Sequence, residues 1–166
     1  MGYKQQIEQR IFASGDDALE IIESWKANGE KIVFSNGCFD IVHRGHIDYL
    51  SQAADLGQRF VIGLNSDSSV RGLKGNDRPI NNEDARAFLL SSLCFVDAVI
   101  LFQESTPYNL IKQIVPNVLV KGNDYTVDQI AGSDVVLNNG GEVITVELTP
   151  GYSSSSIIQK MAKDNG

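Results

Sequence analysis

Both histidines of the 166-residue chain, His43 and His46, lie in one stretch, NGCFDIVHRGHID. The stretch follows an apolar run at residues 31–35 and leads into a helical pattern at residues 45–56. The N-terminus of a helix has free backbone N–H groups and about half a positive charge. Two imidazoles would add hydrogen-bond donors there, and Gly45 would let a phosphate approach the backbone closely. The spacing therefore predicts a phosphate-binding site.

Other interpretations of the histidine pair use the same residues. Two polar side chains at a helix start are often ordinary surface groups, and Cys38 would be a suitable third ligand for zinc, but no recognised metal-ligand spacing is present. The glycines do not form the dinucleotide fingerprint GxGxxG, and no GxxxxGK precedes Ser or Thr as in a P-loop. A phosphate site without protein metal ligands is the favoured hypothesis.

The elements that must position this site alternate along the chain. Short apolar or β-branched runs predict five strands, at residues 31–35, 59–64, 97–102, 118–121 and 142–148. Helical patterns fall at residues 19–25, 45–56, 82–93, 107–115 and 153–163. This order predicts an α/β fold, a Rossmann-like doubly wound parallel five-stranded sheet with helices on both faces. Ligands of such sheets bind beyond the carboxyl ends of the strands.

Length and composition indicate one domain, with residues 1–30 as an N-terminal helical extension and residues 31–166 as the catalytic core. The Gly- and Asn-rich residues 132–141 are expected to form a surface connection. The net charge of −7 argues against a nucleic-acid surface, and no apolar run approaches the ~20 residues of a membrane span. With Cys38 and Cys94 expected to be packed, reduced thiols, we predict a cytoplasmic protein.

Three further groups of candidate residues follow predicted strands. After the second strand, a loop concentrates Arg71, Lys74 and Arg78, which would screen approaching polyanions from one another. Arg86, in the next helix, would reach the same pocket or pair with a neighbouring carboxylate. Two later turns contain Gly, Asp and Ser residues. The glycine would let a ligand approach closely, the aspartate would bind a ribose hydroxyl or a metal-linked water, and the serines would form a second anion site. Tight turns and helix caps use the same residue types. These residues are Lys121, Gly122, Asp124, Gly151, Ser153, Ser154 and Ser155.

Several of these stretches resemble a known family. Gly37, Cys38, Phe39, Asp40 and His43 to His46 are similar to the GxFDxxHxGH signature of the cytidylyltransferase-like nucleotidyltransferases. The stretches NSDSSVRGLKGNDRPIN, VKGNDY, IAG, NGGEV and GYSSSSIIQK resemble the heptose 1-phosphate adenylyltransferases of that family. The resemblance covers the chain from about residue 31 to the C-terminus. It implies transfer of AMP from ATP to D-glycero-β-D-manno-heptose 1-phosphate, giving ADP-heptose and pyrophosphate for lipopolysaccharide core biosynthesis, with Mg²⁺ as cofactor.

The resemblance also implies roles for individual residues. The catalytic residues would be His43, His46 and Lys74, with the two histidines on the triphosphate. The backbone around Phe39 would lie against the nucleotide, although Phe39 is equally suited to the core. Asp40 would orient a substrate hydroxyl or cap a turn. The nucleotide-binding residues would be Cys38, Phe39, Asp40, Gly45, Lys121, Gly122, Asp124, Gly151, Ser153, Ser154 and Ser155. The substrate-binding residues would be Asn65, Asp67, Arg71, Arg78 and Arg86.

Partners and alternatives follow from the same resemblance. Relatives commonly form homodimers, and in 166 residues there is no room for a fused sugar kinase, so a separate kinase and phosphatase are expected to act upstream. No nucleic-acid or membrane partner is expected. The related glycerol-phosphate cytidylyltransferases carry an Arg where this chain has Leu148 and Thr149. A cytidylyltransferase acting on another small phosphate, such as glycerol 3-phosphate, and a non-catalytic nucleotide-binding module are the alternatives.

Overall fold

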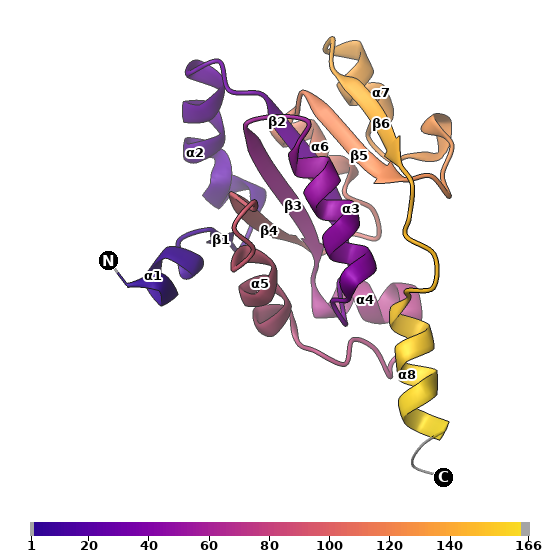
Figure 1. Ribbon diagram of the computed structural model, residues 1–166. Helices are drawn as coiled ribbons and strands as arrows, with labels where there is room; N and C mark the ends of the chain where they lie inside the picture. Colours follow the sequence, from indigo (N-terminus) through magenta and orange to yellow (C-terminus); the bar gives the residue numbers. More distant parts are fainter. Residues whose placement is uncertain (1, 164–166) are drawn as a thin grey trace.

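The strands form one parallel sheet of six, in the order β1-β4-β3-β2-β5-β6 (Figure 1). The computed structural model describes residues 2–163, so both ends of the predicted domain, residue 1 and residues 164–166, lie outside the described residues. The strands are β1 (Ile11–Phe12), β2 (Ile32–Gly37), β3 (Arg59–Asn65), β4 (Ala98–Phe102), β5 (Val118–Gly122) and β6 (Glu142–Val146). The five predicted strands are confirmed, and β1 corrects the predicted number.

The helices include the five that were predicted and others that were not. They are α1 (Tyr3–Glu8), α2 (Gly15–Ala27), α3 (Arg44–Ala54), α4 (Asp67–Lys74), α5 (Glu83–Ser91), α6 (Tyr108–Ile114), α7 (Ser133–Asn138) and α8 (Ser154–Lys163), with a 3-10 turn η1 (Val127–Gln129). Two predictions of irregular chain are wrong. Residues 71–74 belong to α4, and most of the expected connection at residues 132–141 forms α7.

Two apolar cores lie on opposite faces of the sheet. Ile22 of α2, Ile111 of α6 and Val136 of α7 are fully buried in one cluster with side chains of the strands. Leu50 of α3 and Leu90 of α5 are fully buried in the other. Because both faces of the sheet are covered, its central strands are apolar on both sides. The predicted doubly wound fold is confirmed.

The first thirty residues contribute to both the sheet and the core. Ser14 accepts a hydrogen bond from the backbone N–H of Asp17 and so caps α2. Ala18, Ile22 and Trp25 of α2 are buried against the sheet. β1 pairs with β4, so this segment extends the edge of the sheet as well as adding helices.

The order of the strands places a crevice at one point of the sheet. From β2 the chain passes to β3 and β4 on one side, and then returns to β5 and β6 on the other side of β2. Loops that leave the carboxyl ends of β2 and β5 therefore run to opposite faces, which opens a crevice between them. The N-terminus of α8 and the end of α4 lie near this edge (Figure 1). Within residues 2–163, no helix has the length and apolar character needed to cross a bilayer.

Candidate active site

A cavity of about 340 Å³, the first cavity, opens at the carboxyl ends of β2 and β5. It is enclosed by the end of β2, the start of α3, the turn after β5 and residues 148–155, which lead into α8. Most of the predicted nucleotide and catalytic residues meet there. They are Cys38, Phe39, Asp40, His43, Gly45, His46, Lys74, Lys121, Gly122, Asp124, Ser153, Ser154 and Ser155.

His43 is the N-cap of α3. Its backbone is extended, and its Nδ1 accepts a hydrogen bond of 3.3 Å from the backbone N–H of His46. A neutral imidazole that accepts through Nδ1 carries its proton on Nε2. The cap therefore fixes the tautomer of His43 and leaves the Nε2–H as a donor. Burial lowers the pKa of His43 below its ordinary value, which favours this neutral form.

His46 stacks on His43, with 3.8 Å between the ring centroids and 16° between the ring planes. Burial, together with the neighbouring His43 and Lys74, lowers the pKa of His46 to about 4. Its Nδ1 is buried and has no hydrogen-bond partner among the described residues. Near neutral pH the pair thus offers two neutral rings, and one buried ring nitrogen remains available to a ligand.

Phe39 places the backbone of the turn between β2 and α3. Its side chain is 6% exposed, and its ring meets that of His46 edge to face at 5.2 Å. Its φ of 45° is rarely adopted by a residue with a side chain, and such strain is common at functional sites. A Cβ at Gly37 would lie 2.9 Å from the Phe39 ring, so glycine is required there. The aromatic ring therefore belongs to the core, while its backbone borders the cavity.

Tyr49 fixes α3 against the sheet. Its hydroxyl donates to the backbone carbonyl of Val120 on β5 at 3.0 Å and lies 2.7 Å from the hydroxyl of Ser35 on β2. Burial raises the pKa of Tyr49 to about 12, so the hydroxyl keeps its proton. This buried contact links α3 to both strands that flank the crevice, and it holds the histidine pair in place.

Two lysines supply positive charge to the first cavity. Lys74, the last residue of α4, is exposed and borders the cavity. The ammonium group of Lys121 on β5 lies 3.5 Å from the backbone carbonyl of Asn36 and 5.5 Å from the centroid of the Tyr125 ring. Burial lowers the pKa of Lys121. The cations thus approach the histidines from two separate elements.

The segment that leads into α8 packs directly on the start of α3. A Cβ at Gly45 would lie 2.9 Å from the Cβ of Tyr152, and the His43 and Tyr152 rings are stacked with centroids 6.2 Å apart. Thr149 donates to Asp48 at 3.1 Å. A Cβ at Gly122 would lie 2.6 Å from a carboxylate oxygen of Asp124. Side chains of the protein therefore pack closely on both glycines, and both glycines also border the first cavity.

The serines at the start of α8 differ from one another. Ser153 accepts a hydrogen bond from the backbone N–H of Ser156 and acts as a cap, and Ser154 donates to the backbone carbonyl of Ile41. Ser155 borders the cavity. Gly151, with a φ of 86°, turns the chain before them but does not border the first cavity. Residues at the start of α8 and at the start of α3 thus border the same cavity.

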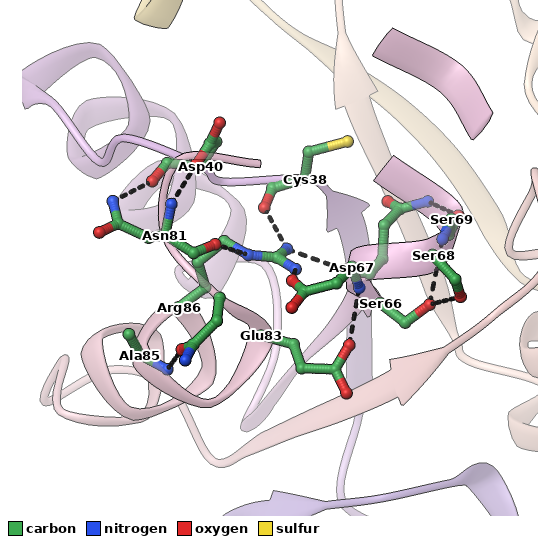
Figure 2. A network of polar contacts seen from close by, with 12 residues as sticks. Cys38, Asp40, Ser66, Asp67, Ser68, Ser69, Asn81, Glu83, Ala85 and Arg86 are labelled. Carbon is green, nitrogen blue, oxygen red and sulfur yellow. Dashed lines mark hydrogen bonds and ion pairs between the residues drawn. The ribbon is translucent and has the colours of Figure 1, made fainter. Parts of the chain in front are cut away.

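Asp40, Asn81, Arg86 and Asp67 belong to a network of polar contacts (Figure 2), and Arg78 joins it through an ion pair with Asp40; we call these five residues the clamp. Asp40 is 3% exposed and accepts from Arg78 at 2.6 Å and from the backbone N–H groups of Ile80 and Asn81. Burial alone would raise the pKa of Asp40, but these hydrogen bonds lower it below its ordinary value. Asp40 therefore holds a turn, one of its two predicted roles, and its carboxylate is occupied.

Arg86 lies at the centre of the clamp, where Figure 2 shows its guanidinium between three segments. It is 1% exposed and donates to the backbone carbonyls of Asn81, Cys38 and Asn65 and to the carboxylate of Asp67. Neither of the two alternatives considered from the sequence is correct. Arg86 makes no surface pair with a carboxylate of its own helix, and it does not border the cavity. It instead ties the ends of β2 and β3 to residues 75–82.

Other predicted substrate contacts lie outside the first cavity. Asp67 pairs with Arg86, Arg78 pairs with Asp40, and Arg71 is exposed on α4. Asn65 is buried and donates to Ser69. The structure therefore does not bring Asn65, Asp67, Arg71, Arg78 and Arg86 to the histidine pair. Of the cysteines, Cys38 is partly buried with a pKa raised by burial, whereas Cys94 is exposed, contrary to prediction.

Sequence reasoning missed residues that shape the first cavity. Tyr152 and Asn36 border it, and Tyr49 anchors its wall. Tyr152 immediately precedes the predicted serine site, so its position in the sequence could have indicated that it borders the cavity. The role of Tyr49 depends on a contact with Val120, 71 residues away, which no local pattern reveals.

A doubly wound parallel sheet whose switch point holds a pocket of imidazoles, lysines and helix N-termini defines the class of nucleotide-binding α/β proteins. The chain belongs to the cytidylyltransferase-like family, whose model matches residues 34–160.

Particular relatives are similar over most of the chain. The protein is 51% identical over 146 residues to the bifunctional protein HldE of Rhodospirillum rubrum, which covers 88% of this chain and 29% of the relative. It is 49% identical over 147 residues to the protein of the same name in Azorhizobium caulinodans; this match covers 89% of this chain and 31% of that relative. The chain thus spans about three tenths of the length of these relatives. The structure of a lipopolysaccharide core biosynthesis protein from Thermoplasma volcanium is similar, with a TM-score of 0.59 and 31% sequence identity. The match covers 73% of this chain and 98% of that protein's chain.

Proposed function

We propose that this protein is a nucleotidyltransferase that transfers AMP from ATP to D-glycero-β-D-manno-heptose 1-phosphate, giving ADP-heptose and pyrophosphate. The observation that carries the proposal is the stacked, neutral pair of His43 and His46 at the start of α3, within reach of a cavity that Lys74 and Lys121 also border. The similarity of the chain to the HldE proteins and to a lipopolysaccharide core biosynthesis protein supports the choice of acceptor.

The residues of the first cavity suit a direct displacement at phosphorus. A phosphate oxygen of the sugar attacks the α-phosphorus of ATP, and the bond to the pyrophosphate oxygen breaks. Such transfers are catalysed by positioning and by donors aimed at the non-bridging oxygens. The Nε2–H of His43, one N–H of the neutral His46 ring and the first backbone N–H groups of α3 supply neutral donors. Lys74 and Lys121 neutralise the negative charge of the phosphates.

We infer that Mg²⁺ enters with the nucleotide. Among residues 2–163, no group of three or more His, Cys, Asp or Glu side chains is arranged to hold a metal. Mg²⁺ commonly keeps several waters and binds through one or two carboxylates plus substrate phosphates. Of the cavity carboxylates, Asp40 is engaged by the clamp, whereas Asp124 is exposed at the cavity and would hold the hydrated ion. When bound, the ion would neutralise negative charge on the phosphates.

The proposal includes a cytoplasmic location, because ATP and sugar phosphates are the co-substrates. Homodimer formation belongs to it as well, and sedimentation of the purified protein would test it.

Measurement of pyrophosphate release tests the proposed reaction. The protein is incubated with Mg²⁺ and ATP, CTP or GTP, each with heptose 1-phosphate or glycerol 3-phosphate. Release with ATP and heptose 1-phosphate, and not with the other pairs, is the expected result. Release with CTP and glycerol 3-phosphate would identify the rival cytidylyltransferase instead. Saturable nucleotide binding without any release would identify a non-catalytic binding module.

A further inference from the structure

The chain between β6 and α8 passes over the start of α3 (Figure 1). We call its residues 149–154 the strap. The helix that follows does little to hold the strap, because none of the residues Ser154–Lys163 of α8 is buried. The position of the strap therefore depends on contacts made by its own residues.

Two hydrogen bonds fasten the strap to the segment that carries the histidine pair. At one end, the hydroxyl of Thr149 donates to the carboxylate of Asp48 at 3.1 Å. At the other end, the hydroxyl of Ser154 donates to the backbone carbonyl of Ile41 at 3.0 Å. Ile41 precedes the histidine pair in the sequence, and Asp48 follows it. The strap is thus attached on both sides of the pair.

Tyr152 lies between these two attachments and meets the start of α3. A Cβ at Gly45 would lie 2.9 Å from the Cβ of Tyr152 and 3.1 Å from Nδ1 of His43. The glycine therefore lets the strap and the imidazole approach each other closely. The Tyr152 and His43 rings are stacked, with 6.2 Å between their centroids and 23° between their planes. The strap thus contacts the imidazole whose Nε2–H is a proposed donor to the phosphates.

The ring of His43 depends on such contacts for its orientation. Its own hydrogen bond, from the backbone N–H of His46, is 3.3 Å long, which is more than the usual length for an N–H donor. A long hydrogen bond restrains the tilt of a ring weakly. Stacking on His46 at 3.8 Å and on Tyr152 at 6.2 Å adds restraint from neighbouring rings. Displacement of the strap would remove the second of these contacts.

Asp48 connects the strap to α3. Its side chain is 32% exposed, and the oxygen that accepts from Thr149 also lies 3.4 Å from Nε of Arg44. The Arg44 side chain is 71% exposed, so this ion pair is screened by water and contributes little. The hydrogen bond from Thr149 is therefore the contact through which Asp48 acts on the strap.

We propose that Asp48 and Thr149 are positioning residues, whose hydrogen bond keeps Tyr152 against the ring of His43 and so fixes the direction of its Nε2–H. This proposal rests on the proposed function, in which His43 contacts the triphosphate. Asp48 and Thr149 act through Tyr152, and neither of them needs to touch a substrate in this role.

Substitution of Thr149 by Val tests the role, because it removes the hydroxyl and keeps the shape of the side chain. The expected result is a fall of about three- to tenfold in kcat, the value of one hydrogen bond, with KM for heptose 1-phosphate nearly unchanged. Thr149→Ser keeps the hydroxyl and should restore most of the rate. The matched control is Thr145→Val on β6, an exposed threonine that does not border the first cavity. Equal losses in Thr149→Ser and Thr149→Val would overturn the proposal.

A double-mutant cycle shows whether the two residues act as one unit. Asp48→Ala should lower kcat to the same degree as Thr149→Val, and the double variant should be no slower than either single variant. Asp48→Asn keeps an oxygen acceptor and should be faster than Asp48→Ala, although both lose the ion pair with Arg44. Losses that multiply in the double variant would show that the residues act independently and would contradict the proposal.

NMR of the two histidine rings tests the contact without turnover. In the absence of nucleotide, Thr149→Val should move the resonances of His43 in the same direction as Tyr152→Leu does, whereas Thr145→Val should leave them in place. A parent kcat in folded Thr149→Val protein would overturn the positioning role, while the proposed reaction stands. The expected shifts in a protein that releases no pyrophosphate from ATP and heptose 1-phosphate would retain the strap contact, but would refute the proposed reaction and the role that rests on it.

Discussion

Arg86 of the clamp and two residues of the first cavity, Lys74 and His46, use nitrogen-bearing side chains in opposite ways. In the clamp, Arg86 is 1% exposed and its guanidinium contacts four groups of the chain. In the first cavity, Lys74 is exposed and His46 keeps a ring nitrogen without a partner among the described residues. A charge bonded to its own chain positions the backbone, whereas a polar group left without a partner at a cavity is available to a ligand.

The largest effect on stability is expected when the clamp loses its centre. Arg86→Met should lower the free energy of unfolding by about 3–5 kcal/mol, because Asp67 and three carbonyls lose their buried partner. Urea denaturation measures the change. Arg71→Met, at an exposed arginine of α4, is the matched control and should stay within about 0.5 kcal/mol of the parent. If the two variants were equally stable, Arg86 would not hold the strand ends together.

The cavity should show the reverse pattern. His46→Ala should lower kcat by about 10²- to 10³-fold, because a donor to the transition state is lost. Circular dichroism should show a folded protein. Gln52→Ala, on an exposed position of the same helix, should keep the parent rate. Parent turnover by folded His46→Ala protein would remove the histidine pair from the mechanism.

Lys74 and Arg71 sharpen the comparison within one helix, because Lys74 borders the first cavity and Arg71 does not. Lys74→Ala should lower kcat/KM by about 10- to 100-fold, the usual range for a charge-assisted hydrogen bond. Arg71→Ala should have a much smaller effect. Equal losses in the two variants would point to a general attraction between the helix and the anionic substrates.

The low pKa of His46 predicts a smaller, pH-dependent effect on stability. The unfolded chain binds a proton on this ring near its ordinary pKa of 6.5, and the folded protein binds it only near 4. The contribution to stability is therefore complete above pH 6.5 and is lost as the pH falls toward 4. Thermal unfolding at several pH values should show this loss in the parent and a weaker one in His46→Gln. The same slope in both proteins would contradict the assignment.

The sequence was most informative where local patterns are strong. Continuous apolar runs located the central strands, and the histidine stretch located the start of α3. β1 has only two residues, too few to show a period, and α4 has a mostly polar sequence, so neither was recognised. The position of Arg86 depends on carbonyl groups 21 and 48 residues away. Charge and motif position therefore suggested it as a ligand contact, and only the fold revealed its buried partners.

The most direct test of the central claim, that the histidine pair contacts the triphosphate, uses the scarcity of histidine in this chain. With only His43 and His46 present, an NMR spectrum of the imidazole groups contains two ring systems. Addition of ATP with Mg²⁺ should shift the resonances of both rings. The shifts should saturate at the same nucleotide concentration as the binding measured by calorimetry. Saturable binding of ATP that leaves both rings unshifted would contradict the account.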